Sequence, residues 1–504
     1  MNFYFESAKV LDQLDAKRGS IKGVIATLPE KSRKRTAAIV IETLKYKHVL
    51  NEVLDASKIM KEEKKLTSRN LALVLVHDLL LANGIQASEG AVKQAVLRHK
   101  TRLHSEFQRI KIKKGVKSTG DLARNGDERA ANIPRYVRVN RTCYTTHEAV
   151  KEFISRGYEL SDPIKNRKAF AKDEHIPDLL LFPPDTPFVD DPLYQSGKLI
   201  LQDKASCFPA FVLDPPANEH SVVIDATAAP GNKTSHLCAL MENKGKLYAL
   251  ERDKKRFETL KMMLSKARCK NVEPINIDFL TISPQDPTYS DVTHILLDPS
   301  CSGSGIVNRL DHLLESGAVR RSLTTSSSDE QTLMHDPPSV IEDQPEGEQE
   351  LRLNKLAAFQ LLMIKHAMKF PSVQRIVYST CSVHTTENEH VVRNALRSEE
   401  CSAGRFKLAP PEEVLPSWKR RGIQEELDHP SDATSIVRCS PGEDATNGFF
   451  VSLFVRDSPP RFVAHSDNRK RKEPEQGPGH GLPSENQAKR KKKRKKTREL
   501  IASD

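Results

Sequence analysis

Hydrophobic residues in the N-terminal region recur at spacings of three and four, which is the pattern of amphipathic helices. The pattern is clearest at residues 4–14, 36–60 and 68–83. Ser68 opens the third segment and is its expected N-cap, because a serine hydroxyl there accepts a hydrogen bond from the first turn. These segments predict a small helical bundle that ends in a basic stretch at 97–117.

From residue 133 the pattern changes to short apolar runs. A strand, a helix and a second strand are expected at 134–140, 146–158 and 178–182. Arginines follow the first strand at every third position: Arg135, Arg138 and Arg141. This segment predicts a small α+β module.

From residue 199 onward, runs of strand length alternate with helix-length segments. Strands are expected at 221–226, 246–251, 272–278, 293–298 and 375–380, with a last one at 448–456. Strands that alternate with helices favour an α/β fold with a parallel, doubly wound sheet. Residues 322–350 are rich in serine, proline and acids, and 486–498 are almost wholly basic, so neither segment is expected to fold.

Charge is unevenly spread along the 504 residues, whose net charge is +12. Residues 1–141 hold 29 Lys and Arg against 15 Asp and Glu, and residues 465–504 hold 13 against 6. Residues 306–350, in contrast, hold 3 Lys and Arg against 10 Asp and Glu. The basic ends favour a polyanionic partner such as nucleic acid over merely solvated helix faces. The tail also fits a nuclear or nucleolar targeting signal.

Composition narrows the class of protein. No run of about eighteen apolar residues exists, so no transmembrane helix is expected, and the first residues do not resemble a signal peptide. The eight cysteines form no C-x-x-C pair, which argues against a metal site. Reduced thiols of this kind remain available for reactive chemistry.

The first strand of the alternating region leads into a loop of small residues and then a helix. This loop, at 226–232, contains one glycine and fits neither a dinucleotide fingerprint nor a phosphate loop. Asp225, Glu251 and Asp278 end three successive strands, where acids bind ribose hydroxyls. The pattern favours a nucleoside cofactor without a phosphate, such as S-adenosylmethionine, over simple turn-capping acids.

Two cysteines follow neighbouring strands. Cys301 lies in "LLDPSCSGSG", three positions after Asp298, and Cys381 lies in "IVYSTCSVHTTENEHVV". The carboxyl ends of parallel strands meet at one edge of a sheet, where ligands bind. A single cysteine there is often inert core, but two at the same edge predict a functional pair.

The motifs "DATAAPGNKTSH", "DPSCSGSG", "YSTCSVHTTENEHVV" and "NGFF", in this order, resemble the RsmB/NSUN-type RNA cytosine-C5 methyltransferases. The segment "LILQDKASCFPA" is similar to that family's lead-in, and the resemblance covers about residues 135–455. The loop variants, "RGSIKG" and the helical N-terminal region are most similar to the fifth NSUN paralogue's branch, which methylates large-subunit ribosomal RNA.

The resemblance implies a class I, Rossmann-like methyltransferase sheet. The implied organisation is a helical basic N-terminal domain at 1–125, a small α+β RNA-binding module at 130–198, a methyltransferase domain at 199–456 with a disordered acidic insert at 306–350, and a disordered polybasic tail at 457–504.

Specific roles follow from the same resemblance. Cys381 is the expected nucleophile toward cytosine C6, because a thiolate forms far more readily than an alkoxide. Cys301 is expected to resolve the covalent adduct, Asp298 to bind the cytosine edge, and Lys233 to hold the base or its developing charge. The expected S-adenosylmethionine contacts are Thr227, Ala228, Ala229, Pro230, Gly231, Asn232, Lys233, Glu251, Arg256, Asp278 and Asp298. No metal is expected.

The sequence departs from the family pattern at four points. Thr227 replaces a cysteine, Asn232 replaces a glycine, and Glu251 replaces an aspartate. Ser300 separates Pro299 from Cys301, which bears on how that thiol is aimed.

The expected partner is ribosomal RNA or a pre-ribosomal particle in the nucleus and nucleolus, with no membrane and a monomeric catalytic unit. An alternative is a non-catalytic ribosome-assembly factor that keeps the methyltransferase fold and binds RNA. A third possibility, an amino-methyltransferase, is disfavoured because "DPSC" lacks that class's second proline and aromatic residue.

Overall fold

The computed structural model describes residues 1–16, 18–19, 21–124, 127–307, 313–314 and 346–457. The predicted tail and most of the predicted acidic insert lie outside these residues. None of the helices in the described part is long and apolar enough to cross a membrane.

The N-terminal region is helical, as predicted. Its helices are α1 (Asn2–Asp15), α2 (Ile21–Ala26), α3 (Glu30–Ser57), α4 (Ile59–Glu62), α5 (Arg69–Leu81), α6 (Ala91–Arg98) and α7 (Lys100–Lys113), followed by the 3-10 turns η1 (Gly120–Leu122) and η2 (Glu128–Asn132). The Ser68 hydroxyl accepts a hydrogen bond from Leu71 N at 3.3 Å, so the predicted cap of α5 is confirmed. Helix α5 is buried on most sides, and Tyr4 Oη donates to Asp78 at 2.6 Å within the bundle.

The α+β module contains a five-stranded sheet in the order β2-β3-β4-β1-β5. Its elements are β1 (Arg135–Val139), α8 (Thr146–Ser155), β2 (Glu159–Leu160), β3 (Ala169–Lys172), β4 (Leu179–Phe182), α9 (Pro192–Gln195) and β5 (Leu199–Leu201). Because β5 pairs with β1, the module extends to Leu201 and not to 198 as expected. Arg138, the second of the three regularly spaced arginines, has a fully buried side chain.

The third region contains an eight-stranded sheet in the order β11-β13-β10-β9-β6-β7-β8, with β12 paired to β13. The strands are β6 (Val222–Asp225), β7 (Lys246–Leu250), β8 (Val272–Ile275), β9 (His294–Leu297), β10 (Arg375–Thr380), β11 (Phe406–Leu408), β12 (Ile436–Cys439) and β13 (Phe449–Arg456). Strands β6 to β10 are parallel, and β13 runs antiparallel to β10. The predicted Rossmann-like methyltransferase sheet is therefore confirmed.

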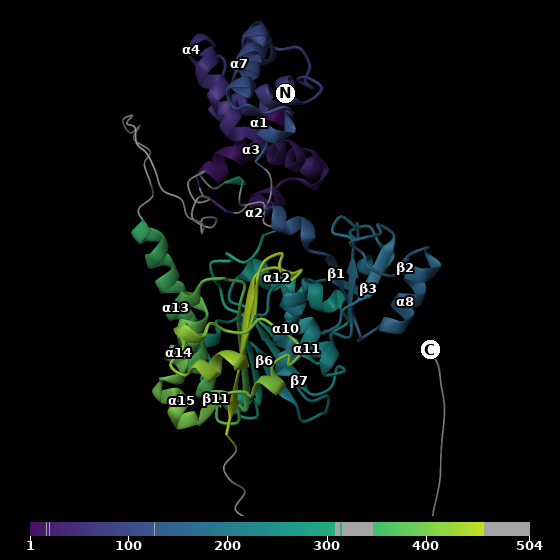
Figure 1. Cartoon of the computed structure of the whole chain (residues 1–504), viewed down its shortest axis with the longest axis vertical. Helices are drawn as coiled ribbons and strands as arrows, with labels where there is room; N and C mark the ends of the chain where they lie inside the picture. The colour runs from purple at the N-terminus through teal and green to yellow at the C-terminus, as the bar shows by residue number, and fades with distance from the viewer. Residues whose placement is uncertain (17, 20, 125–126, 308–312, 315–345, 458–504) are drawn as a thin grey trace, which may run out of the picture. The chain divides into compact units, whose positions relative to one another are not determined.

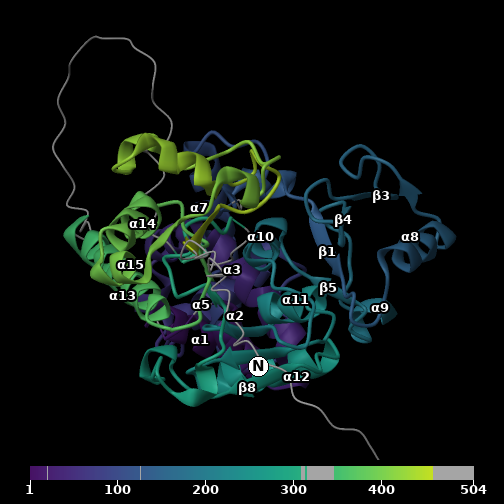
Figure 2. The ribbon, with the colours of Figure 1, turned by 90° about the horizontal axis from the view of Figure 1, so that it is seen from below.

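Alternate residues of the central strands face two separate cores. Ile224, Ile295 and Ile376 pack on one face, and their neighbours Val223, Leu296 and Val377 pack on the other. Figures 1 and 2 show α13 (Glu346–Met368), α14 (Glu389–Leu396) and α15 (Glu399–Gly404) on the first face. Helices α10 (Lys204–Leu213) and α11 (Asn232–Leu240) cover the second. This double burial explains why the strands are almost wholly apolar.

Several elements differ from the expected pattern. Helix α13 begins at Glu346, so the acidic insert ends before residue 350. Helix α12 (Lys254–Lys266) follows β7, but β8 and β9 are joined only by the short turns η3 (Phe279–Thr281) and η4 (Pro287–Tyr289). In the described residues after α13, the short 3-10 turns are η7 (Thr385–Glu387), η8 (Pro411–Glu413), η9 (Gln424–Glu426) and η10 (Pro430–Ser435).

Candidate active site

The cofactor loop, residues 226–232, leaves the carboxyl end of β6 and enters α11. Asp225 ends the strand and accepts a hydrogen bond from Thr234 Oγ1 at 2.7 Å. Burial raises the pKa of Asp225 to about 6, because the charged carboxylate is poorly solvated there. Gly231 has a φ of 110°, which favours glycine at this turn.

The predicted cofactor residues meet at the edge formed by β6, β7 and β8. Glu251 follows β7 and is buried, while Asp278 follows β8 and pairs with Arg252 at 3.2 Å. Arg256 Nη2 donates to Ala229 O at 2.6 Å, and its Nη1 lies 3.4 Å from Glu251 Oε2. Arg256 therefore joins the loop to Glu251 across neighbouring strands.

These groups fit S-adenosylmethionine. Asn232 Oδ1 is buried and meets no hydrogen-bond partner among the described residues. This oxygen can therefore accept a hydrogen bond from a ligand bound at the loop. The first turn of α11 offers backbone N–H groups suited to a carboxylate. Glu251 suits ribose hydroxyls. When bound there, the cofactor would supply an electrophilic methyl group.

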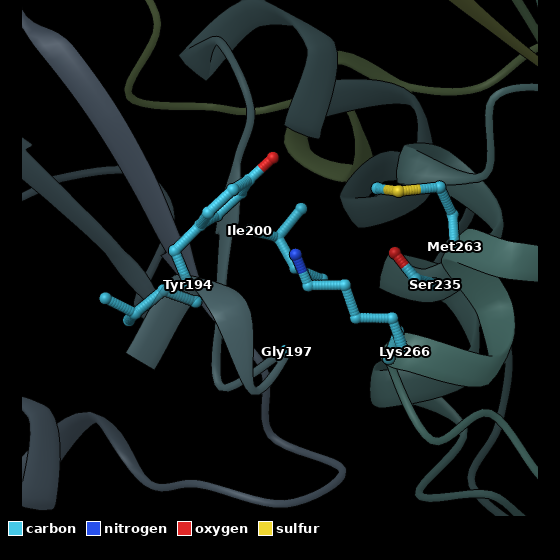
Figure 3. Close-up of a pocket in the computed structure, with 8 residues that line it drawn as sticks. Tyr194, Gly197, Ile200, Ser235, Met263 and Lys266 are labelled. Atoms are coloured by element: carbon cyan, nitrogen blue, oxygen red, sulfur yellow. The ribbon is translucent and has the colours of Figure 1, made fainter. Parts of the chain in front are cut away.

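A small cavity lies beside this edge, between the module and the cofactor helices (Figure 3). Its volume of about 10 Å³ has room for about one water and not for a nucleoside. Ser235 of α11 and Lys266 of α12 line it, and Lys266 Nζ lies 3.9 Å from the centre of the Tyr194 ring. The cavity is therefore a packing gap and not the cofactor site.

Lys233 and Asp298 form a partly buried ion pair with Nζ to Oδ2 at 2.7 Å. Burial alone would lower the pKa of Lys233, but the Asp298 carboxylate outweighs it, so the pKa is raised. The charge of Cys381 acts in the same direction. Lys233 is therefore an ammonium group close enough to favour a thiolate at Cys381.

The two predicted thiols meet directly. Cys301 Sγ and Cys381 Sγ are 3.1 Å apart, and both side chains are partly exposed. The hydrogen bond with Cys381 and burial raise the pKa of Cys301, so Cys301 retains its proton when the pair ionises.

Backbone contacts hold the two thiol loops together. Gly305 N donates to Cys381 O at 2.9 Å, and Gly448 N donates to Gly305 O at 2.8 Å. A Cβ atom on Gly305 would lie 2.3 Å from Gly448 O, so this approach excludes any side chain. The "NGFF" segment thus touches the loop that carries Cys301.

Sequence reasoning missed several residues of this constellation. Ser379 Oγ donates to Asp298 Oδ1 at 2.8 Å, and Ser206 Oγ accepts from Lys233 Nζ at 3.2 Å. Asp203 accepts from Asn447 Nδ2 at 2.7 Å, which fixes the turn before β13. Ser206 and Asp203 lie in the quoted lead-in segment, so that motif was the available signal.

Curated relatives match nearly the whole chain. The 25S rRNA (cytosine-C(5))-methyltransferase rcm1 of Schizosaccharomyces pombe is 42% identical over 90% of this chain and 91% of its own. The 28S rRNA (cytosine-C(5))-methyltransferase of Mus musculus is 39% identical over 90% of this chain and 91% of its own. The 25S rRNA (cytosine-C(5))-methyltransferase NSUN5 of Arabidopsis thaliana is 36% identical over 90% of this chain and 72% of its own. The chain belongs to the NSUN5 family.

Family models agree with this membership. The N-terminal domain of NOL1/NOP2/Sun domain family member 5 matches residues 34–123, and its ferredoxin-like domain matches 133–202. The model of the 16S rRNA methyltransferase RsmB/F matches 210–320. The crystal structure of PH0851 has a TM-score of 0.54 at 22% identity, over 90% of this chain and 97% of its own, which supports the fold. As an NSUN5-family protein, the chain is an RNA cytosine-C5 methyltransferase that uses S-adenosylmethionine, as predicted.

Proposed function

We propose that this NSUN5-family protein forms 5-methylcytosine in large-subunit ribosomal RNA through a covalent adduct between Cys381 and cytosine C6. The substrate is supported by relatives named for 25S and 28S rRNA. The proposal includes a pre-ribosomal or free RNA partner in the nucleus and nucleolus. The mechanism rests on one observation above all, the 3.1 Å approach of Cys301 and Cys381.

The first step is addition. The Cys381 thiolate would bond to cytosine C6 and make C5 enamine-like. Bound S-adenosylmethionine would supply the methyl group that C5 takes up, and would leave as S-adenosylhomocysteine. Lys233 favours the thiolate, and the Lys233–Asp298 pair offers both an ammonium donor and a carboxylate acceptor to the cytosine edge. Ser379 fixes the second oxygen of Asp298, so the carboxylate is preorganised.

The second step is release. A base removes the C5 proton, the C6–sulfur bond breaks, and its electron pair returns to Cys381 as a thiolate. Cys301, whose raised pKa keeps it protonated, lies where it can hydrogen-bond to the departing sulfur. This supports the assignment of Cys301 to adduct resolution.

The test replaces the protein in cells by Cys381→Ala and reads large-subunit rRNA by bisulfite sequencing. We expect the target cytosine to become unmethylated, while Cys143→Ala, which removes a thiol outside the site, leaves it methylated. Methylation that persists with Cys381→Ala would refute the nucleophile. If complete loss of the protein leaves the methylation pattern of large-subunit rRNA unchanged, this rRNA is not the substrate. That result would favour the non-catalytic alternative.

A further inference from the structure

Two adjacent buried residues, Glu387 and Asn388, brace the two thiol loops separately. Both side chains have zero exposure, and they follow Cys381 at the end of η7. Neither takes a part in the proposed chemistry. We infer that Asn388 is the positioning residue of Cys381 and Glu387 the positioning residue of Cys301. This inference rests on the proposed function of the two thiols.

Asn388 holds the backbone and side chain on both sides of Cys381. Its Oδ1 accepts a hydrogen bond from Thr380 Oγ1 at 2.6 Å, and its Nδ2 donates to Ser382 O at 3.0 Å. The residues before and after the thiol are thereby fixed to one planar amide. Cys381 is aimed by a rigid frame instead of by a free loop.

Glu387 and Gln360 hold the residues on both sides of Cys301. Glu387 Oε1 accepts from Ser302 N at 2.9 Å and from Gln360 Nε2 at 3.0 Å. Gln360 Nε2 also donates to Ser300 O at 3.1 Å. Ser300, which separates Pro299 from Cys301 in this chain, is thereby held in place. This contact helps to fix the direction of the Cys301 thiol, although the family pattern places that cysteine directly after the proline.

The brace is itself fixed by α13 and β10. Tyr378 Oη lies 2.5 Å from Glu387 O and 3.0 Å from Gln360 Oε1, and both Tyr378 and Gln360 are fully buried. Glu387 Oε2 is buried and meets no hydrogen-bond partner among the described residues. A buried carboxylate with a spare oxygen costs free energy. Its retention here is explained by the Ser302 contact, which an apolar residue cannot make.

Separate braces predict opposite kinetic defects. Loss of Asn388 misaims the attacking thiol, so Asn388→Ala should form little adduct and little product. Loss of Glu387 misaims the resolving thiol, so Glu387→Ala should form the adduct and release it slowly. We expect release to slow by about 10- to 100-fold, the effect of leaving one buried hydrogen-bonding group, here Ser302 N, without its partner.

The experiment incubates each purified full-length variant with S-adenosylmethionine and large-subunit rRNA from cells lacking the protein. Denaturing gels measure the protein–RNA adduct, and bisulfite sequencing measures the product. Cys301→Ala is the reference for a stalled adduct. Glu387→Gln keeps the acceptor for Ser302 N and should restore release, while Gln360→Met should stall like Glu387→Ala.

Glu389→Ala is the matched control. Glu389 is another fully buried glutamate of the same segment, but its Oε1 accepts from Ile423 N at 3.2 Å and lies 3.4 Å from Arg438 Nη1. Within the described residues its carboxylate makes no contact with the Cys301 loop. We expect no stalled adduct from it. Stalling by Glu389→Ala, or a Glu387→Ala protein that loses adduct and product together, would overturn the inference. If Cys301→Ala itself fails to stall, the proposed resolving role fails instead.

Discussion

The buried carboxyl group of Asp225 makes the catalytic domain sensitive to pH. Its pKa is about 6 in the folded protein against 3.8 for the reference group. The folded state therefore holds a proton that the unfolded state releases, and stability falls as pH rises from about 4 to above 6. Between pH 4.5 and 7 the loss amounts to about 2 kcal/mol.

Asp225→Asn removes this titration and can keep an acceptor for Thr234. We expect the melting temperature of the variant, relative to the native protein, to rise as pH increases from 4.5 to 7. The exposed Asp214→Asn is the control and should show no such trend. If the difference in melting temperature between Asp225→Asn and the native protein stays constant with pH, the burial of Asp225 does not raise its pKa as argued.

Individual residues show what the sequence could predict. Cys301 and Cys381 were predictable as neighbours because each directly follows a strand, and parallel strands end at one edge. The burial of Arg138 was not predicted, because an arginine is almost never fully buried unless it is paired. A spacing of three places Arg135 and Arg138 on opposite faces of a strand, because side chains alternate with a period of two. Arg138 instead bonds Gln202 at 2.7 Å and Ser235 at 2.8 Å.

At the scale of elements, the approach of the Cys301 loop to the start of β13 permits a direct test. Gly305→Ala places a methyl group against the backbone of Gly448, which cannot move without disturbing β13. We expect methylation to fall by at least about 100-fold while the protein stays folded, since misplacement by about 1 Å has such effects. Gly347→Ala, where a Cβ meets nothing within 4 Å, should retain activity in the same assay. Equal activity of the two variants would show that this contact does not position the thiols.

The long strands and helices of the fold followed from hydrophobic pattern, but the short elements did not. Strand β5 has three residues, too few to show any periodicity, and only its pairing with β1 assigns it to the module. The turns between β8 and β9 similarly replace a helix that alternation would suggest. The braces at Glu387 and Asn388 were missed because their partners lie 6 to 85 positions away in the chain, at no regular spacing that a sequence pattern would show.

At the scale of the whole molecule, the distribution of charge predicts how the protein holds RNA. Residues 486–498, outside the described part, contain nine Lys and Arg. If this segment neutralises phosphates, its deletion should reduce the slope of log affinity against log salt in RNA binding, with methylation at saturating RNA unchanged. Nitrocellulose binding across a salt series measures the slope. An unchanged slope, with the protein lost from the nucleus, would assign the segment to targeting.

The position of β13 also sets when activity becomes possible. This strand is the last of the sheet in the chain, yet it inserts between β10 and β11, and Gly448 at its start holds the loop of Cys301. A chain still being synthesised can form β6 to β10 and both thiols, but not the contact that aligns them. Alignment of the two thiols therefore waits for the segment that carries Gly448, although both thiols precede that segment in the chain.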